Sequence, residues 1–265
     1  MKKKLKIAIV TGASSGMGKE FVRQIAEKYL WIDEIWVISR NRKRLEALRL
    51  ECESKYGVNI VPIRLDLRKR TDLEKLKSRL ELVSPWIKIL VNGAGSGQIG
   101  QFAELPISSQ CSCTRLNCEA LISVTYICLP YMKRRSRIIQ MASAAAFVPQ
   151  YGFAVYAASK SYVLSFARAL RSEVAQRGIT VTAVCPGPVD TPFFDKAEKF
   201  HAMPEFKKSS MARPKAVVEK AVKDAACGKE LSIYGTNIKL LFMGCKLLPH
   251  KLIIQATRCL EHAAD

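Results

Sequence analysis

Residues 6–18 of this chain read KIAIVTGASSGMG, an apolar run that ends in three closely spaced glycines. Because its apolar residues are consecutive rather than alternating, the run predicts a strand buried on both faces. The helical spacing of Phe21, Ile25 and Ala26 predicts a helix over residues 16–29. Glycines let a backbone approach a pyrophosphate closely, and the following helix N-terminus supplies free N–H groups. A glycine turn can also be a simple tight connection, but this position after an N-terminal strand favours dinucleotide binding.

The rest of the chain continues the alternation of strands and helices. Further strands are predicted at residues 34–38, 60–65, 87–91, 138–142 and 179–185. Helices are predicted at residues 42–56, 73–83 and 114–133, and again after Tyr156. Continuously apolar strands between helices are typical of a parallel sheet covered on both faces, and right-handed crossovers make it a doubly wound Rossmann-type sheet. No linker or internal repeat divides the chain, so we expect one α/β domain over residues 1–265.

The composition is that of a globular protein with a strongly basic surface. Hydrophobic residues make up 49% of the chain and charged residues 25%, which allows a sizeable core. The formal net charge of +20 could reflect nucleic acid, an anionic membrane surface or anionic ligands. The basic residues are scattered and are not interleaved with aromatic ones, which favours a solvated basic surface and no nucleic-acid partner.

The cysteines and the first residues bear on the cellular compartment. The nine cysteines include no Cys-x-x-Cys pair, which predicts reduced thiols in a cytoplasmic protein. Only three histidines are present, so no metal site is expected. Residues 1–5 are basic but no cleavable apolar core follows them, so no signal peptide is expected. No apolar run reaches the roughly eighteen residues of a membrane span.

The end of the second strand indicates which dinucleotide binds. An NAD-dependent protein places an acidic residue there for the ribose 2′-hydroxyl. This chain has Ser39, Arg40 and Asn41, with further basic residues at 42–44. The planar guanidinium of Arg40 can make paired, charge-assisted bonds to a 2′-phosphate. The sequence therefore predicts NADP(H), although an arginine at a helix start can also be an ordinary surface residue.

Tyr156 and Lys160 lie four residues apart and so share one face of a predicted helix. A tyrosine hydroxyl normally titrates near pH 10, and a fixed ammonium nearby favours the phenolate and lowers that pKa. A bare Tyr-x-x-x-Lys is most often a half-buried aromatic beside a solvated lysine. Its surroundings, which begin with Ser143 at the end of a predicted strand, favour a catalytic role.

These motifs together resemble the short-chain dehydrogenase/reductase family over residues 6 to about 195. The motifs are Thr11-Gly12-x-x-x-Gly16-x-Gly18, Asn92-Gly93-Ala94-Gly95, Asn117, Ser143 with Tyr156-x-x-x-Lys160, and Pro186-Gly187-x-x-x-Thr191. Ser143 and Tyr156 have the separation usual in the family. Gly93 is a common variant of the family's second asparagine, and the strand near residue 138 follows Asn117 about two residues sooner than usual.

The resemblance implies an NADP(H)-dependent enzyme that interconverts a ketone and a secondary alcohol. Tyr156 would be the general acid/base, and Lys160 would lower its pKa and hold the nicotinamide ribose. Ser143 would hydrogen-bond the reacting oxygen, and Asn117 would hold a water that links Lys160 to solvent. Besides Tyr156 and Lys160, the implied cofactor-binding residues are Thr11, Gly12, Ser14, Ser15, Gly16, Met17, Gly18, Ser39, Arg40, Asn41, Asp66, Leu67, Asn92, Ala94, Gly95, Pro186, Gly187, Val189 and Thr191. Among these, Asp66 and Leu67 would line the adenine, and Asn92 would support the central sheet.

The segments expected to contact the substrate are residues 96–113, 144–152 and 193–211. Their large apolar residues indicate a bulky apolar substrate and are Phe102, Leu105, Phe147, Val148, Tyr151, Phe153, Phe193, Phe194, Phe200 and Met203. The resemblance is to the branch of hydroxysteroid dehydrogenases and long-chain 3-oxoacyl reductases. A steroid-like ketone is our expectation, with a 3-oxoacyl thioester as the alternative. The competing class is a non-enzymatic NADP(H)-sensing protein, which would have no chemical need for the four catalytic residues.

The C-terminal region departs from the family. Many relatives end in a short strand and a Gly-Gly segment that helps to form tetramers, whereas this chain has an apolar and basic tail over residues 236–265. We therefore expect a homodimer rather than a tetramer. Pro249 divides the tail into two predicted helices. The tail is predicted to cover the substrate cleft together with a lid at residues 193–213, and a helix lying on a membrane surface is the alternative.

Overall fold

A single parallel sheet forms the centre of the molecule. The computed structural model describes residues 4–198, 200–201, 208–247, 249, 251 and 255. The seven strands lie in the order β3-β2-β1-β4-β5-β6-β7, and every neighbouring pair is parallel. They span β1 Lys6–Thr11, β2 Glu34–Ser39, β3 Asn59–Arg64, β4 Trp86–Asn92, β5 Arg137–Met141, β6 Thr180–Val184 and β7 Leu231–Ser232. The prediction of a doubly wound α/β fold is confirmed.

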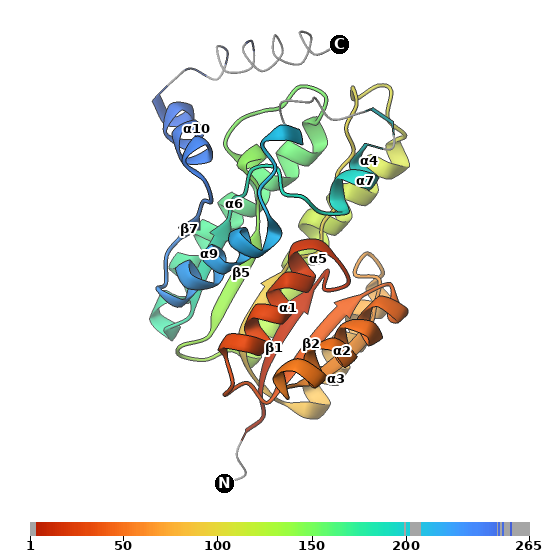
Figure 1. Cartoon of the computed structure of the whole chain (residues 1–265), viewed down its shortest axis with the longest axis vertical. Coiled ribbons are helices and arrows are strands. Elements are labelled where there is room, and N and C mark those ends of the chain that lie inside the picture. The colour runs from red at the N-terminus through yellow and green to blue at the C-terminus, as the bar shows by residue number, and fades with distance from the viewer. Residues whose placement is uncertain are drawn as a thin grey trace.

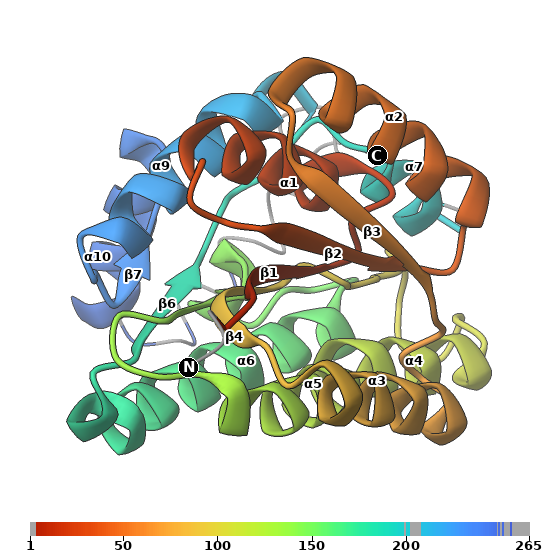
Figure 2. The same cartoon turned by 90° about the horizontal axis from the view of Figure 1, so that it is seen from below.

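Helices cover both faces of this sheet (Figure 2). On one face lie α1 Gly16–Lys28, α2 Arg42–Tyr56 and α9 Pro214–Ala226. On the other lie α3 Arg70–Val83, α4 Ile107–Thr114, α5 Ala120–Cys128 and α6 Ala154–Val174. Alternate residues of β1 point to opposite faces: Ile7 and Ile9 join the core under α3, α5 and α6, whereas Ala8 and Val10 join the core under α1 and α2. Burial on both faces explains why the strand is apolar throughout.

The strand order reverses between β1 and β4, and this reversal places the site. The chain runs outward from β1 through β2 to β3, then returns to pair β4 with the other side of β1. The loops that leave β1 and β4 therefore diverge at the carboxyl edge of the sheet and leave a crevice there, as expected for a doubly wound fold.

Two elements differ from the sequence prediction. The helix predicted at 114–133 starts earlier, as α4, and passes through a π-helical turn at Arg115–Glu119 before α5. The two-residue strand β7 is too short to leave an apolar pattern in the sequence. The tail contains α10 Thr236–Leu247, and the second helix predicted after Pro249 falls largely outside the described residues. Within the described part of the chain, no helix combines the length and apolar character required to cross a membrane.

Candidate active site

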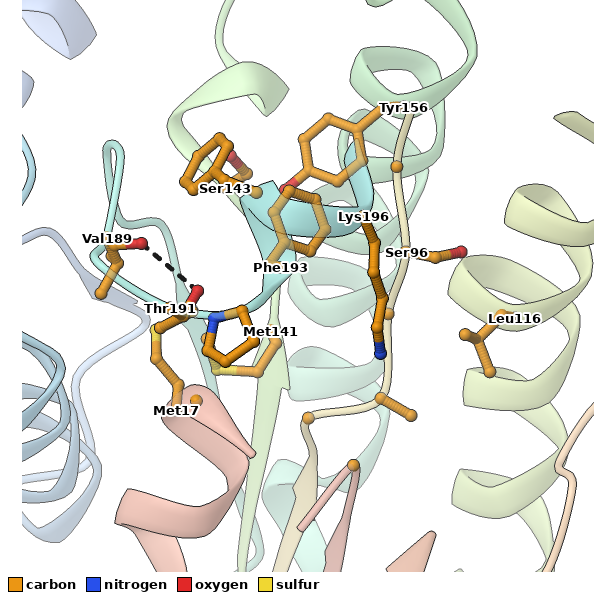
Figure 3. Close-up of a pocket in the computed structure, with 18 of the residues that line it drawn as sticks. Met17, Ser96, Leu116, Met141, Ser143, Tyr156, Val189, Thr191, Phe193 and Lys196 are labelled. Carbon is orange, nitrogen blue, oxygen red and sulfur yellow. Dashed lines mark hydrogen bonds between the residues drawn. The ribbon is translucent and has the colours of Figure 1, made fainter. Parts of the chain in front are cut away.

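A cavity of about 1160 Å³ opens at the carboxyl edge of the sheet. Loops after β1, β2, β3, β4, β5 and β6 line it, as do the short helix α7 Phe193–Ala197 and α10. Figure 3 shows Met17 on one side of this cavity, Ser143 and Tyr156 above it, and Ser96 and Leu116 on the far side. Pockets for one small ligand are usually about 300–1,000 Å³, so this cavity has room for a large cofactor together with a substrate.

The glycine turn after β1 forms a close-packed cradle. Gly12 and Gly16 have φ angles of 69° and 52°, which favour glycine. A Cβ on Gly18 would lie 2.2 Å from the carbonyl oxygen of Gly12, so the turn accepts no side chain there. The N-cap Ser15 makes no side-chain capping bond, and the first turn of α1 carries no acid. The N–H groups at this helix start are therefore available to an anionic group such as a pyrophosphate.

Hydrogen bonds fix this cradle against the neighbouring loop. The Thr11 hydroxyl accepts a bond from the Ala94 N–H at 3.1 Å and donates to the Val91 carbonyl at 3.4 Å. Thr11 itself is buried and does not line the cavity. Asn92 is also buried, and its amide donates to Thr125 Oγ1 and Gln140 Oε1 at 2.9 and 3.0 Å. Asn92 thus ties the middle of the sheet to α5, the supporting place expected from the resemblance.

The end of the cavity beside β2 is strongly basic. Arg40 is exposed there, and Asn41 caps α2 by accepting a 3.0 Å bond from the Arg44 N–H. The cations that line this end are Arg40, Arg42, Lys43, Arg44 and Arg64. Asp66, the acidic residue at this end, is paired with Arg68. It therefore does not balance the five basic side chains, and this end of the cavity keeps a net positive charge. This end of the cavity fits a phosphate ester.

Asp66 is more constrained than the sequence indicated. Its carboxylate accepts bonds of 2.9 and 2.6 Å from Nε and Nη2 of Arg68, which also donates to Ser112 Oγ at 2.7 Å. The bonds from Arg68 lower the pKa of Asp66 to about 2, and Arg40 contributes to the shift. Asp66 lines the cavity as expected. Because its carboxylate already accepts bonds from Arg68, an adenine would have to bind the same carboxylate together with Arg68. Arg68 belongs to none of the motifs, so its pairing with Asp66 was not predicted from the sequence.

Ser143, Tyr156 and Lys160 all line the cavity. Ser143 follows β5 and caps the short 3₁₀ turn Ala144–Ala146, its Oγ accepting a 3.1 Å bond from the Ala145 N–H. The ring of Tyr156 stacks on Phe153 with centroids 4.2 Å apart and meets Phe193 at 5.5 Å. Burial raises the pKa of Tyr156 to about 12, and a hydrogen bond with Ser143 offsets this only in part. Tyr156 is therefore a protonated phenol at neutral pH.

The structure differs here from the expectation that Lys160 lowers the pKa of Tyr156. The Lys160 Nζ lies 5.6 Å from the centre of the Tyr156 ring and donates a 2.7 Å bond to the Met141 carbonyl. Lys160 is only 5% exposed, and this burial lowers its own pKa to about 8. Desolvation thus dominates both groups, and attraction between the ammonium and the phenolate does not overcome it.

Asn117 lies in the π-helical turn, where it joins three parts of the site. Its Oδ1 accepts a 2.9 Å bond from the Ser96 N–H, and its Nδ2 donates at 2.9 Å to both the Ser96 carbonyl and Ser159 Oγ. A Cβ on Gly95 would lie 3.3 Å from Asn117 Oδ1 and 3.5 Å from Lys160 Nζ, so the two side chains flank the same glycine. The side chain of Asn117 is buried behind the cavity rather than lining it.

The remaining predicted cofactor residues lie where a dinucleotide would extend. Those lining the cavity are Gly12, Ser14, Ser15, Gly16, Met17, Gly18, Ser39, Arg40, Asn41, Asp66, Leu67, Ala94, Gly95, Pro186, Gly187, Val189 and Thr191. The glycine cradle, the free helix start and the basic end form one continuous trough. The residues present therefore fit a dinucleotide that carries an additional phosphate.

The substrate side is built from the predicted segments, but only some of the predicted side chains line it. Val148, Tyr151, Phe153, Phe193 and Phe194 line the cavity as predicted. The other predicted substrate residues do not line it: Phe102 and Phe200 are exposed, Leu105 and Phe147 are buried, and Met203 lies outside the described residues. Lys196, from the predicted segment 193–211, also lines the cavity, as do Ile238 and Leu241 from the tail that was predicted to cover the cleft. Figure 3 shows Phe193 and Lys196 extending from α7 into the cavity.

Phe147 is turned away from the cavity because α10 packs on it. The rings of Phe147 and Phe242 have centroids 4.8 Å apart, and Ile238 and Leu241 on the same helix line the cavity. The first part of the tail thus forms a wall of the substrate side. The lid predicted at 193–213 is described only in part, because residues 199 and 202–207 lie outside the described ranges.

The comparison of sequences gives one family. The family model described as short chain dehydrogenase matches residues 6–202. An uncharacterized oxidoreductase of Staphylococcus epidermidis is 28% identical over 193 residues, covering 72% of this chain and 81% of its own length. A very-long-chain 3-oxoacyl-CoA reductase of Emericella nidulans is 35% identical over 184 residues, covering 67% of this chain. The chain spans about half of that reductase, 52% of its length.

Solved structures agree with this result. A short-chain dehydrogenase from Sphingobium yanoikuyae, in complex with NADPH, has a TM-score of 0.78 and 25% identity, and the match covers 92% of this chain and 94% of that one. A 7β-hydroxysteroid dehydrogenase has a TM-score of 0.80 but 18% identity over 96% of this chain and 99% of that one, so it supports the fold alone.

Proposed function

This chain belongs to the short-chain dehydrogenase/reductase family, whose members are oxidoreductases acting on CH–OH and C=O groups with a nicotinamide cofactor, and we propose that it reduces a bulky apolar ketone with NADPH. The observation that carries the proposal is geometric: Ser143, Tyr156 and Lys160 line the same cavity as the glycine cradle. The hydroxyl of Tyr156 is protonated at neutral pH and can donate its proton to a carbonyl oxygen bound there.

The proposed chemistry uses three side chains at the reacting carbonyl. The bound cofactor supplies the hydride to the carbonyl carbon. The hydroxyl of Tyr156 donates its proton to the carbonyl oxygen, and the hydroxyl of Ser143 donates a hydrogen bond to the same oxygen. Lys160, largely protonated at pH 7, stabilises the negative charge left on Tyr156. Asn117 is bonded both to Ser96 and to Ser159, the residue before Lys160, and so ties the loop after β4 to α6.

The preference for NADP(H) rests on the basic end of the trough. Five basic residues line this end of the cavity, and the charge of the neighbouring Asp66 is already balanced by Arg68. A 2′-phosphate would be attracted to these side chains, whereas an NAD ribose would find no free carboxylate among the lining residues at this end. The complex of the Sphingobium relative with NADPH supports the same choice.

The substrate side favours a bulky apolar ketone of one of two classes. Aromatic and aliphatic side chains from α7, α10 and the loop before α6 surround the cavity beside Tyr156. Several relatives are named very-long-chain 3-oxoacyl-CoA reductases and are 30–35% identical to this chain, which favours a long-chain 3-oxoacyl thioester. A steroid-like ketone is the second candidate, since the same apolar walls would accept it.

We also infer a homodimer. Tyr126 on α5 and Tyr162 on α6 are 81% and 43% exposed, and both helices cover the same face of the sheet. Exposed aromatic side chains of this kind are enriched at protein interfaces. Sedimentation velocity on wild type and Tyr126→Glu would show a dimer that the substitution converts to a monomer.

The test of function is turnover across a panel of ketones. Long-chain 3-oxoacyl thioesters, steroid ketones and sugar ketones are offered with NADPH, and NADPH consumption is followed. We expect turnover with one of the apolar classes and a loss of at least about 10² in folded Tyr156→Phe. Tight NADPH binding without turnover of any ketone would instead identify a cofactor-sensing protein. Near-normal activity of Tyr156→Phe would remove Tyr156 from the mechanism.

A further inference from the structure

Helix α10 is apolar on two opposite sides. Its inner side packs against the core through Ile238, Leu241, Phe242 and Cys245, which recur at helical spacing. Its outer side carries Leu240, Met243 and Leu247, which are 65%, 51% and 79% exposed. These three residues, called the outer stripe below, lie three and four positions apart and so form one line along the helix.

The outer stripe is unusual for a helix at the surface. A helix that is apolar all round is normally buried all round, because each large side chain left in water forfeits the free energy of burial. Among the residues that the structure describes, none covers the outer stripe. Figures 1 and 2 show α10 at the edge of the molecule, where a large surface could approach it.

The charge around α10 indicates what kind of surface covers the stripe. Residues 231–260 contain no Asp or Glu, and their Lys and Arg residues are Lys239, Lys246, Lys251 and Arg258. Lys239 and Lys251 are exposed. A second copy that presented this same basic helix would bring like charges together and be repelled. An anionic lipid surface would instead be attracted, by about 1 kcal/mol for each lysine or arginine near it.

The outer stripe lies directly behind the wall of the substrate cavity. Ile238 and Leu241 on the inner side line that cavity, and Ile238 is packed so closely on the loop after β6 that a Cβ on Gly187 would lie 2.6 Å from it. A surface seated on the outer stripe would therefore lie one helix diameter from the space where an apolar substrate binds. This arrangement suits a substrate that is taken up from a lipid phase.

We propose that α10 docks the protein on an anionic lipid bilayer, with Leu240, Met243 and Leu247 inserted among the acyl chains and the neighbouring lysines against the headgroups. The docking itself stands on the outer stripe and its charge, and only the uptake of substrate from the bilayer rests on the proposed function. Docking is therefore tested without any substrate.

The test is co-sedimentation of the full chain with vesicles. Vesicles of phosphatidylglycerol and phosphatidylcholine are compared with pure phosphatidylcholine, at low and at high salt. We expect binding to the anionic vesicles that weakens as salt screens the lysines. Leu240→Glu/Met243→Glu should lower the partition coefficient at least about tenfold, because apolar burial is lost and two like charges face the lipid.

The matched control is Leu50→Glu/Leu82→Glu, which makes the same change of charge at residues 60% and 87% exposed on α2 and α3. Its binding to anionic vesicles should be much closer to that of wild type than the binding of the α10 variant is. Both variants should keep their circular dichroism and NADPH affinity, since none of the four residues lines the cavity. The single substitution Leu247→Gln, which adds no charge, provides a milder second variant with the same expected direction.

Three outcomes would overturn the proposal. Wild type that remains in the supernatant with anionic vesicles would show that α10 does not dock on lipid. An equal loss of binding in the control would show that net charge alone drives the association. A dimer that the α10 variant dissociates, with no vesicle binding by wild type, would assign the stripe to a second copy of the chain. Failure of the ketone panel would leave all of these readings unchanged.

Discussion

Replacing Lys160 with methionine should change the free energy of unfolding in a way that depends on pH. Lys160 is 5% exposed and its pKa falls from 10.5 to about 8 because burial disfavours the ammonium. A displacement of that size corresponds to roughly 3 kcal/mol of destabilisation while the lysine is charged in both states. Methionine fills a similar volume without a charge, so Lys160→Met removes this cost.

The sign follows from the proton balance. Below pH 8 both the folded and the unfolded chain hold the proton on Lys160, and the full cost is present. Between pH 8 and 10.5 the folded lysine is neutral while the unfolded one still binds a proton, so wild type gains stability as the pH rises. Between pH 7 and 9.5 wild type should gain about 2 kcal/mol relative to Lys160→Met.

The substitution also removes the 2.7 Å bond from Lys160 to the Met141 carbonyl, and a buried acceptor left unpaired costs roughly 1–3 kcal/mol. That loss does not depend on pH. The decisive quantity is therefore how much the difference in unfolding free energy between wild type and Lys160→Met changes from pH 7 to pH 9.5. It is measured by urea unfolding of the cofactor-free proteins, with the exposed Lys223→Met on α9 as the control for removing one charge. A difference between wild type and Lys160→Met that is the same at pH 7 and 9.5 would refute the desolvation of Lys160.

Three further predictions concern the cofactor and the reaction. Arg40→Ala should weaken NADPH binding about ten- to a hundredfold and leave NADH nearly unchanged, because only the 2′-phosphate contacts are lost; Ser39→Asp should reverse the preference, and equal weakening of both cofactors by Arg40→Ala would contradict the assignment. In Gly18→Ala, the new methyl would lie 2.2 Å from the Gly12 carbonyl, so the cradle must distort and NADPH affinity should fall at least tenfold in fluorescence titration; an unchanged dissociation constant would rule this out. The rate of ketone reduction should fall as the pH rises through about 8, where Lys160 loses its proton, and a profile that is flat to pH 10 would argue against a charged Lys160.

Much of the fold followed from local patterns. The run at 6–10 predicted a strand buried on both faces, and β1 is one, because side chains on either side of the sheet face separate apolar layers. The π-helical turn at Arg115–Glu119 could not be predicted, because no residue type in this segment distinguishes a π-helical turn from an ordinary helical one. The strand β7 was missed because only two residues pair with β6.

The part of the candidate site that could be predicted consists of residues whose type and spacing indicate their chemistry. Ser143, Tyr156 and Lys160 reach one cavity from β5 and α6. The burial that raises the pKa of Tyr156 was not predicted, because the sequence gives the spacing to Lys160 but not the depth at which both groups lie. The pair of Asp66 with Arg68 and the bonds of Asn117 to Ser96 and Ser159 depend on the positions of loops, which no motif encodes.

The order in which the cavity walls occur along the chain has an evolutionary consequence. Every expected cofactor contact lies at or before Thr191, whereas α7 and α10 follow it. The family match also ends close to this point, at residue 202. Substitutions confined to the part of the gene after codon 192 can therefore reshape two walls of the substrate side while every expected cofactor contact keeps its residue.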